Sequence, residues 1–140
     1  MEVGENERSI ELQHPIHIRR KMIKTAQKQT DEWEILIDLL SHGMDLVNLE
    51  DRYGKNKVKK ALAKIHRFVL FDDGVLGYKS WEDGNQVTRL VVPEGLQEAI
   101  LKEYHDLPHS GHYGIYKTTQ RIKRLYWWKG MTRKIARYVL

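Results

Sequence analysis

Hydrophobic residues in the first half of the chain recur at the spacing of amphipathic helices. In residues 31–40 they lie at i, i+3, i+4 and i+7, which places them on one face of a helix. These positions are Trp33, Leu36, Ile37 and Leu40. Residues 55–66 show the same period with lysines on another face, whereas residues 45–53 are expected to be a connector. The pattern therefore predicts a helical region over residues 31–66.

The period changes after this region from that of helices to that of β-strands. Three apolar runs are separated by two turn sequences rich in Asp and Gly. The runs are residues 68–71, 75–79 and 87–92, and the turns are Asp72-Asp73-Gly74 and Asp83-Gly84-Asn85. Three strands with one buried face hold together where an isolated hairpin would be marginal. A small antiparallel β-meander is therefore expected over residues 67–92.

The helical period returns after Pro93, which suits the first turn of a helix. We expect one helix that ends near His105, a second over residues 114–126, and a third after the break at Gly130. The predicted inward positions are Leu96, Ala99, Ile100, Tyr104, Ile115, Thr118 or Thr119, Ile122, Leu125, Tyr126, Met131, Ile135, Tyr138 and Val139. Short helices with tight connections are typical of helix-turn-helix-like modules, so residues 93–140 are expected to form one.

The predicted fold class is therefore α+β, with N-terminal helices, a small antiparallel β-meander and a C-terminal three-helix module. Residues 1–30 are expected to be a flexible arm that is acidic at first and basic from residue 14 onward. For the basic part, a short helix, a solvated linker, a nucleic-acid arm and a nuclear-localisation patch all fit the sequence.

Length, charge and composition limit the kinds of protein and of binding partner that fit this sequence. The chain has 140 residues, enough for one ordinary domain or two very small ones. Its formal net charge of +5 and pI of about 9.4 permit a nucleic-acid partner. The chain has no Cys and therefore no disulfide framework. No apolar run approaches the ~20 residues that span a bilayer, so we expect an intracellular protein with no membrane partner.

The last part of the chain, residues 114–140, contains basic and aromatic residues but no acidic ones. The candidate nucleic-acid-binding residues are Lys117, Arg121, Lys123, Arg124, Lys129, Arg133, Lys134 and Arg137. Phosphate contacts through such side chains give affinity that falls with salt and carries no base information. A solvated basic face is the alternative interpretation. Among the aromatic residues, Trp128 is expected in the core and Trp127 at the surface or against a partner.

Three histidines, His105, His109 and His112, lie close together in the sequence before this basic segment. Neutral imidazole is the commonest metal ligand in proteins. The spacing by itself fits either a metal site or histidines of a loop or helix cap. With Asp106 added, a hydrolytic metal site with an open position is a further alternative. No nucleophile, phosphate-loop or metalloprotease motif is present, so these motifs supply no catalytic residue.

The order of residues in this last segment resembles the zinc-binding N-terminal region of integrases from gypsy-like LTR retrotransposons. The matching positions are His105-Asp106, Gly111-His112, Gly114, Lys117-Thr118, Ile122, Tyr126, Trp128, Gly130-Met131, Ile135 and Tyr138-Val139. Lys129 departs from the family, which often has Pro at this position. The resemblance implies zinc as the metal, with His105 and His112 as ligands and His109 as the substitute.

In that family a Cys-x-x-Cys pair follows and completes the zinc site. This sequence stops at Leu140, about where the first of those cysteines would come, so the resemblance implies an incomplete site. The catalytic acids of an integrase lie in a separate ribonuclease-H-like domain. The resemblance thus implies a non-catalytic N-terminal portion of an integrase, with no catalytic residue, no enzyme activity and no small-molecule substrate.

Such a portion is expected to bind DNA, to associate with itself or with other integrase domains in DNA integration, and to be nuclear. A second hypothesis is a co-opted adaptor derived from an integrase, without DNA or metal binding. Its helices would use Trp33, Leu36 and Leu40 to bind another protein.

Overall fold

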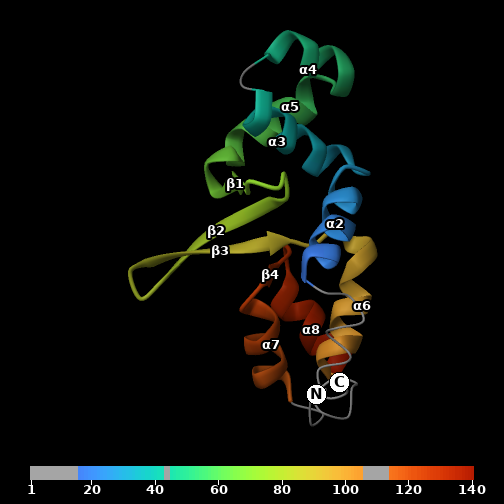
Figure 1. Cartoon of the computed structure of the whole chain (residues 1–140), viewed down its shortest axis with the longest axis vertical. Coiled ribbons are helices and arrows are strands. Elements are labelled where there is room, and N and C mark those ends of the chain that lie inside the picture. The colour runs from blue at the N-terminus through green and yellow to red at the C-terminus, as the bar shows by residue number, and fades with distance from the viewer. Residues whose placement is uncertain (1–15, 43–44, 106–113) are drawn as a thin grey trace.

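The computed structural model describes residues 16–42, 45–105 and 114–140. The helices are α2 (Ile16–Gln27), α3 (Asp31–His42), α4 (Leu46–Tyr53), α5 (Lys55–Lys64), the short 3-10 helix η1 (Ile65–Arg67), α6 (Glu94–His105), α7 (Ile115–Lys123) and α8 (Met131–Val139). The strands are β1 (Phe68–Leu70), β2 (Leu76–Glu82), β3 (Asn85–Val91) and β4 (Tyr126–Trp127). The strands lie between a group formed by α3, α4 and α5 and a group formed by α6, α7 and α8 (Figure 1). No described helix has the length and apolar character needed to cross a membrane.

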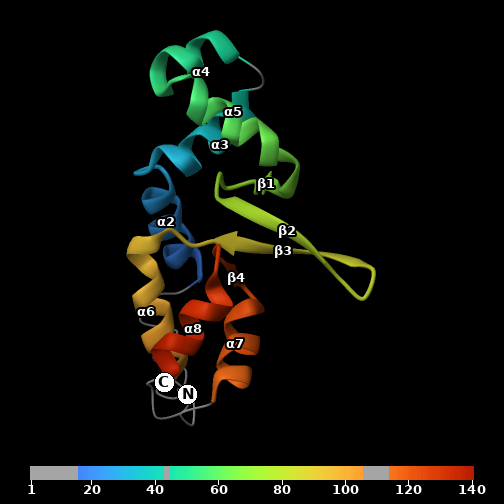
Figure 2. The same cartoon turned by 180° about the vertical axis from the view of Figure 1, so that it is seen from behind.

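The first three strands form the antiparallel meander that the sequence predicts. β1 pairs with β2 and β2 pairs with β3, both antiparallel, so the α+β fold class is confirmed. The β2–β3 hairpin turns at Asp83 and Gly84, whose φ angles of 52° and 80° are both positive, as a type I′ turn requires. Beyond the helical groups, this hairpin projects to one side of the molecule (Figure 2).

A fourth strand, β4, was not predicted. The sequence pattern placed Tyr126 at the end of a helix, but α7 stops at Lys123 and the chain then pairs parallel with β3. The backbone N–H of Leu90 donates to the carbonyl of Leu125 over 2.8 Å, and the N–H of Val92 donates to the carbonyl of Trp127 over 2.9 Å. The C-terminal helices are therefore joined to the meander by backbone hydrogen bonds.

The sheet separates two hydrophobic clusters, because successive side chains of a strand point to opposite faces. Leu76 and Val91 belong to the cluster with α3, α4 and α5. Val75, Leu90 and Val92 belong to the cluster with α6, α7 and α8. In β4, Tyr126 is fully buried in the second of these clusters, whereas the half-buried Trp127 packs against both.

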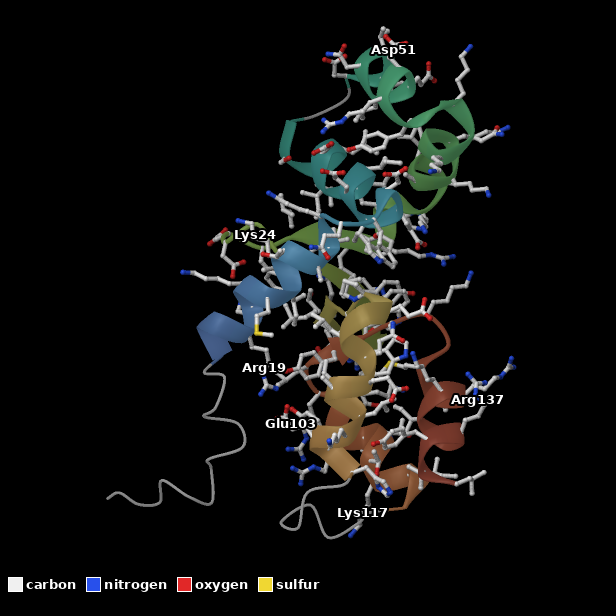
Figure 3. The ribbon with its side chains drawn as sticks, turned by 90° about the vertical axis from the view of Figure 1, so that its right-hand side faces the viewer. Arg19, Lys24, Asp51, Glu103, Lys117 and Arg137 are labelled. Atoms are coloured by element: carbon white, nitrogen blue, oxygen red, sulfur yellow. The ribbon has the colours of Figure 1, made fainter. Side chains whose placement is uncertain are left out.

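The prediction of a flexible arm over all of residues 1–30 is wrong for its basic part, because residues 16–27 form α2, which confirms the alternative of a short helix there. This helix buries Ile23 in the cluster of α6, α7 and α8. The guanidinium of Arg19 donates to the hydroxyl of Tyr126 over 2.9 Å and to the carboxylate of Glu103 on α6 over 3.1 Å (Figure 3). Burial alone would lower the pKa of Arg19, but these two partners outweigh it and raise that pKa, so Arg19 stays charged. Residues 1–15 lie outside the described part of the chain.

Several other positions differ from their predictions. The expected connector over residues 45–53 contains α4, which begins after an Asp45 side chain that accepts from the backbone N–H of Asn48. A short polar side chain at this position stabilises the start of a helix. Ala99 and Leu125, predicted to face inward, are exposed.

The surface proposed for a protein-binding adaptor is not available in this fold. Trp33 and Leu36 are 8% and 0% exposed, and they pack in the cluster of α3, α4 and α5. Leu40 is half-buried against the same cluster. The apolar stripe of α3 was predicted correctly, but it forms core and not a docking face.

A buried glutamine fastens α2 to the sheet. Gln27 is fully buried, and its amide N–H groups donate to the carbonyls of Leu76 and Val91 over 3.0 and 2.8 Å. Its side-chain oxygen accepts from the backbone N–H of Leu76 over 2.8 Å. These bonds satisfy backbone groups just past the last pairing of β2 with β3, at Gly77 and Leu90.

We expect Gln27→Leu to destabilise the fold strongly. The substitution leaves one N–H and two carbonyls buried without these partners, and each such group costs about 1–3 kcal/mol. Urea unfolding should therefore show a loss of at least about 3 kcal/mol. The control is Gln29→Leu at an exposed position two residues away, which should change stability by no more than about 0.5 kcal/mol. Equal effects of the two variants would contradict the role given to Gln27.

Candidate nucleic-acid interface

The structure separates the eight predicted nucleic-acid-binding residues into groups. Lys117, Arg124, Lys129, Arg133 and Arg137 are exposed. Arg121, Lys123 and Lys134 are half-buried. The eight residues come from α7, from the segment after it and from α8. Exposure alone therefore does not place them on one common surface.

Four of the eight surround one hollow beside α8. The hollow has a volume of about 510 Å³ and is lined by Glu94, Gln97, Lys129, Gly130, Arg133, Lys134 and Arg137. We call it the α8 hollow. Because Met131 and Ile135 are buried, the helical period turns Arg133 and Arg137 outward on one face of α8. Gly130 precedes the helix with φ of 75°, a left-handed conformation that glycine adopts without strain.

Electrostatically, the α8 hollow is positive. Its lining has four basic side chains and one acidic side chain, Glu94. Lys129, Arg133 and Arg137 reach it from exposed positions, so their charges are accessible to a ligand in solvent. Figure 3 shows Arg137 pointing away from the ribbon of α8. An anion is the kind of ligand that this arrangement favours.

Lys134 has a second task in the fold. Its ammonium donates to the side-chain oxygen of Gln97 on α6 over 2.6 Å. Gln97 is buried, and its amide N–H donates to the carbonyl of Val92 over 3.0 Å. The chain of contacts links α8, α6 and the end of β3. Lys134 is therefore a structural residue as well as a lining residue.

The remaining candidates lie elsewhere. Lys117 is at the far end of the module, near the start of α7 (Figure 3). The guanidinium of Arg121 lies 5.8 Å from the centre of the Tyr104 ring, which holds it against α6. Neither of these residues lines the α8 hollow, and Lys123 and Arg124 do not line it either. The structure thus brings together half of the predicted set and places the other half apart.

Arg89 is a residue that the sequence pattern missed. It is 5% exposed, although its place in β3 gave no sign of a buried charge. Its guanidinium donates to the backbone carbonyl of Lys123, to the hydroxyl of Ser80 and to the carboxylate of Glu82. It therefore fixes the end of α7 against the β2–β3 hairpin. Hydrogen-bond partners that are distant in the sequence cannot be predicted from residue spacing.

Of the three candidate metal ligands, His105 is the one that the structure describes. It is half-buried at the end of α6, with its ring centre 6.0 Å from that of Tyr138 on α8. His109 and His112 lie outside the described residues, as does Asp106. Over residues 16–42, 45–105 and 114–140, no three His, Cys, Asp or Glu side chains come together to hold a metal. A complete metal site is therefore not formed by the described residues.

Comparison with known proteins decides what this module resembles. Residues 92–140 match the family model described as the integrase zinc binding domain. The resemblance to retrotransposon integrases is thereby confirmed for this part of the chain, and zinc is the metal that the match implies.

A curated relative agrees with this match. The Retrovirus-related Pol polyprotein from transposon 412 of Drosophila melanogaster is 46% identical over 56 residues, which are 39% of this chain and 4% of the polyprotein. The chain thus aligns with a very small part of that relative. No solved structure matches the chain.

We expect Lys134→Met to lower stability more than substitution of its exposed neighbour. A hydrogen bond to a charged group contributes about 1.5–3 kcal/mol when buried, and the half-buried Lys134–Gln97 bond should contribute about 1 kcal/mol. Arg133→Met is the matched control, because Arg133 is exposed and should change stability by less than about 0.5 kcal/mol. Urea unfolding monitored by tryptophan fluorescence measures both. A larger loss in Arg133→Met would contradict this division of roles.

Proposed function

We propose that this chain is a non-catalytic, nucleic-acid-binding portion of a retrotransposon-type integrase, and that the α8 hollow contacts the phosphates of duplex DNA. The observation that carries the proposal is the gathering of Lys129, Arg133 and Arg137 at exposed positions around one hollow with one acid. The integrase match over residues 92–140 supports the same reading. Self-association with integrase domains and a nuclear location stay predictions that rest on the resemblance.

The geometry suits a phosphate backbone better than a small ligand. Arg133 and Arg137 stand one helical turn apart on the same face of α8, and Lys129 precedes the helix. Three cations in a row along one edge of the module match a row of negative charges. The hollow offers no buried apolar lining of the kind that small-molecule sites use. Binding through these residues should therefore be independent of base sequence.

We expect Arg133→Glu combined with Arg137→Glu to weaken binding to duplex DNA and to flatten its salt dependence. Three phosphate contacts predict a slope of log affinity against log salt of roughly −3, and loss of two contacts should bring it to about −1. Fluorescence anisotropy over a range of salt concentrations measures the slope.

The matched control reverses two lysines of α5 that have the same spacing. Lys55 and Lys59 are exposed and lie four residues apart on α5, a helix that is distant from α8 (Figure 1). Lys55→Glu with Lys59→Glu changes net charge equally but should leave the salt slope unchanged. A similar loss in both double variants would show that binding depends on net charge alone, and would overturn the assignment to the α8 hollow.

We also propose that His105 and His112 are zinc ligands in this module, since both occupy the ligand positions of the integrase pattern. A structural zinc site normally has four protein ligands, and imidazoles alone supply two or three here. The zinc affinity of this chain should therefore be well below that of a complete site.

We expect added zinc to raise the melting temperature of the metal-free chain modestly. Circular dichroism during heating measures this temperature. His112→Ala should abolish the increase. His66→Ala is the matched control, because His66 is exposed in η1 and lies outside the integrase-type module. An unchanged melting curve, or an equal effect of His66→Ala, would contradict the ligand assignment while leaving the DNA-binding proposal to its own test.

A further inference from the structure

A second hollow, larger than the α8 hollow, lies between the β2–β3 hairpin, η1 and the start of α8. Its volume is about 670 Å³. We call it the aromatic groove and define it by six of its lining residues, Arg67, Tyr78, Trp81, Lys123, Trp127 and Lys129. Its lining combines aromatic and cationic side chains, whereas the lining of the α8 hollow has no aromatic residue.

The aromatic side chains of the groove are held in fixed positions. The rings of Tyr78 and Trp127 stack with centres 3.7 Å apart and planes 5° apart. Trp127 also meets the buried rings of Trp33 and Phe68 edge to face, at 6.5 and 6.1 Å. The stacked pair therefore needs no reordering when a ligand binds.

Trp81 is different, because it is 68% exposed on β2 while it lines the same groove. An exposed indole presents a free apolar face to a ligand. Trp81 belongs to the hairpin that projects to one side of the molecule (Figure 2). It is thus the aromatic residue of the groove most accessible to a planar partner.

The groove carries surplus positive charge. Its two acidic lining residues are already paired, Glu32 with Lys64 over 2.9 Å and Glu82 with Arg89. Three further cations, Arg67, Lys123 and Lys129, line the groove with no additional acid among its lining residues to balance them. An anionic ligand with flat rings is the chemistry that these side chains recognise together.

The groove adjoins the α8 hollow. Lys129 and Gly130, in the segment that leads into α8, line both hollows. A polyanion that lies along Arg133 and Arg137 therefore passes Lys129 to enter the groove. The two hollows are thus neighbours, the first lined mainly by cationic side chains and the second by aromatic and cationic ones.

From this arrangement we propose that the aromatic groove binds an unpaired strand of nucleic acid that adjoins a duplex held at the α8 hollow. The inference rests on the proposed function for the duplex part. A base inside a duplex has both faces covered by its neighbours, so only an unpaired base can stack on Trp81. Aromatic faces combined with a cationic groove are the features that bind single strands without sequence preference. Arg67 and Lys123 are placed to contact the phosphates of that strand.

The test compares three probes by fluorescence anisotropy: a blunt duplex, the same duplex with a short oligothymidine overhang, and free oligothymidine. The wild-type chain should bind the overhang duplex about tenfold more tightly than the blunt duplex. Trp81→Ala should remove this preference and leave the affinity for the blunt duplex unchanged. Tyr116→Ala is the matched control, since Tyr116 is 74% exposed on α7 and does not line the groove.

Arg67→Ala provides a second variant that keeps every aromatic ring. It should weaken binding to the overhang duplex and to free oligothymidine, whereas Lys102→Ala, at an exposed position of α6 outside the groove, should not. Circular dichroism checks that each variant is folded. Because Trp81 and Arg67 are exposed, their removal should not change the spectrum.

The outcomes separate this inference from the proposed function. Equal affinity of the wild-type chain for the overhang duplex and the blunt duplex would contradict the groove as a site for an unpaired strand, but not the α8 hollow as a site for duplex DNA. Binding of free oligothymidine that Trp81→Ala weakens supports the groove even if the blunt duplex does not bind. If polyglutamate binds in a Trp81-dependent manner and neither oligothymidine nor the overhang does, the groove takes an acidic protein segment and the inference is overturned.

Discussion

The parallel pairing of β4 with β3 is the contact on which the arrangement of this chain depends. Two backbone hydrogen bonds, from Leu90 to Leu125 and from Val92 to Trp127, join the C-terminal helices to the meander. The pairing also determines to which face of the sheet each side chain after α7 points. Tyr126 and Trp128 enter the core of α6, α7 and α8, while Trp127 stacks on Tyr78. Without it, the module would carry its basic helix but would not form the aromatic groove beside it.

Much of this fold follows from local periodicity, because a buried face imposes its period on the sequence. The stripe of α3, the strands of the meander and the inward face of α8 at Met131 and Ile135 were predicted on that basis, and burial confirms them. β4 could not be predicted in the same way, since a two-residue strand is too short to show any period. Its pairing depends on β3, more than thirty residues earlier in the chain.

Polar side chains inside the fold escaped prediction for a related reason. Gln27 and Arg89 are buried because they satisfy backbone groups of distant segments, and neither has a neighbour in sequence that signals this role. The same holds for Lys134, whose sequence context matches that of the other basic residues of α8 although its ammonium donates a hydrogen bond to Gln97 on α6. In the candidate site, composition predicted the sign of the charge correctly. Which cations share a surface depended on the packing of α6 against α8.

The net charge of +5 is therefore a poor guide to where an anion binds. The ion pairs that the structure describes join Arg19, Arg20, Lys57, Lys64 and Arg89 to acidic partners. Two of the paired residues, Lys57 and Lys64, are lysines of α5. Lys129, Arg133 and Arg137 take part in none of them. These three cations line one hollow that has a single acidic residue, next to the groove with the fixed aromatic stack, and this arrangement, rather than the net charge, favours the α8 hollow.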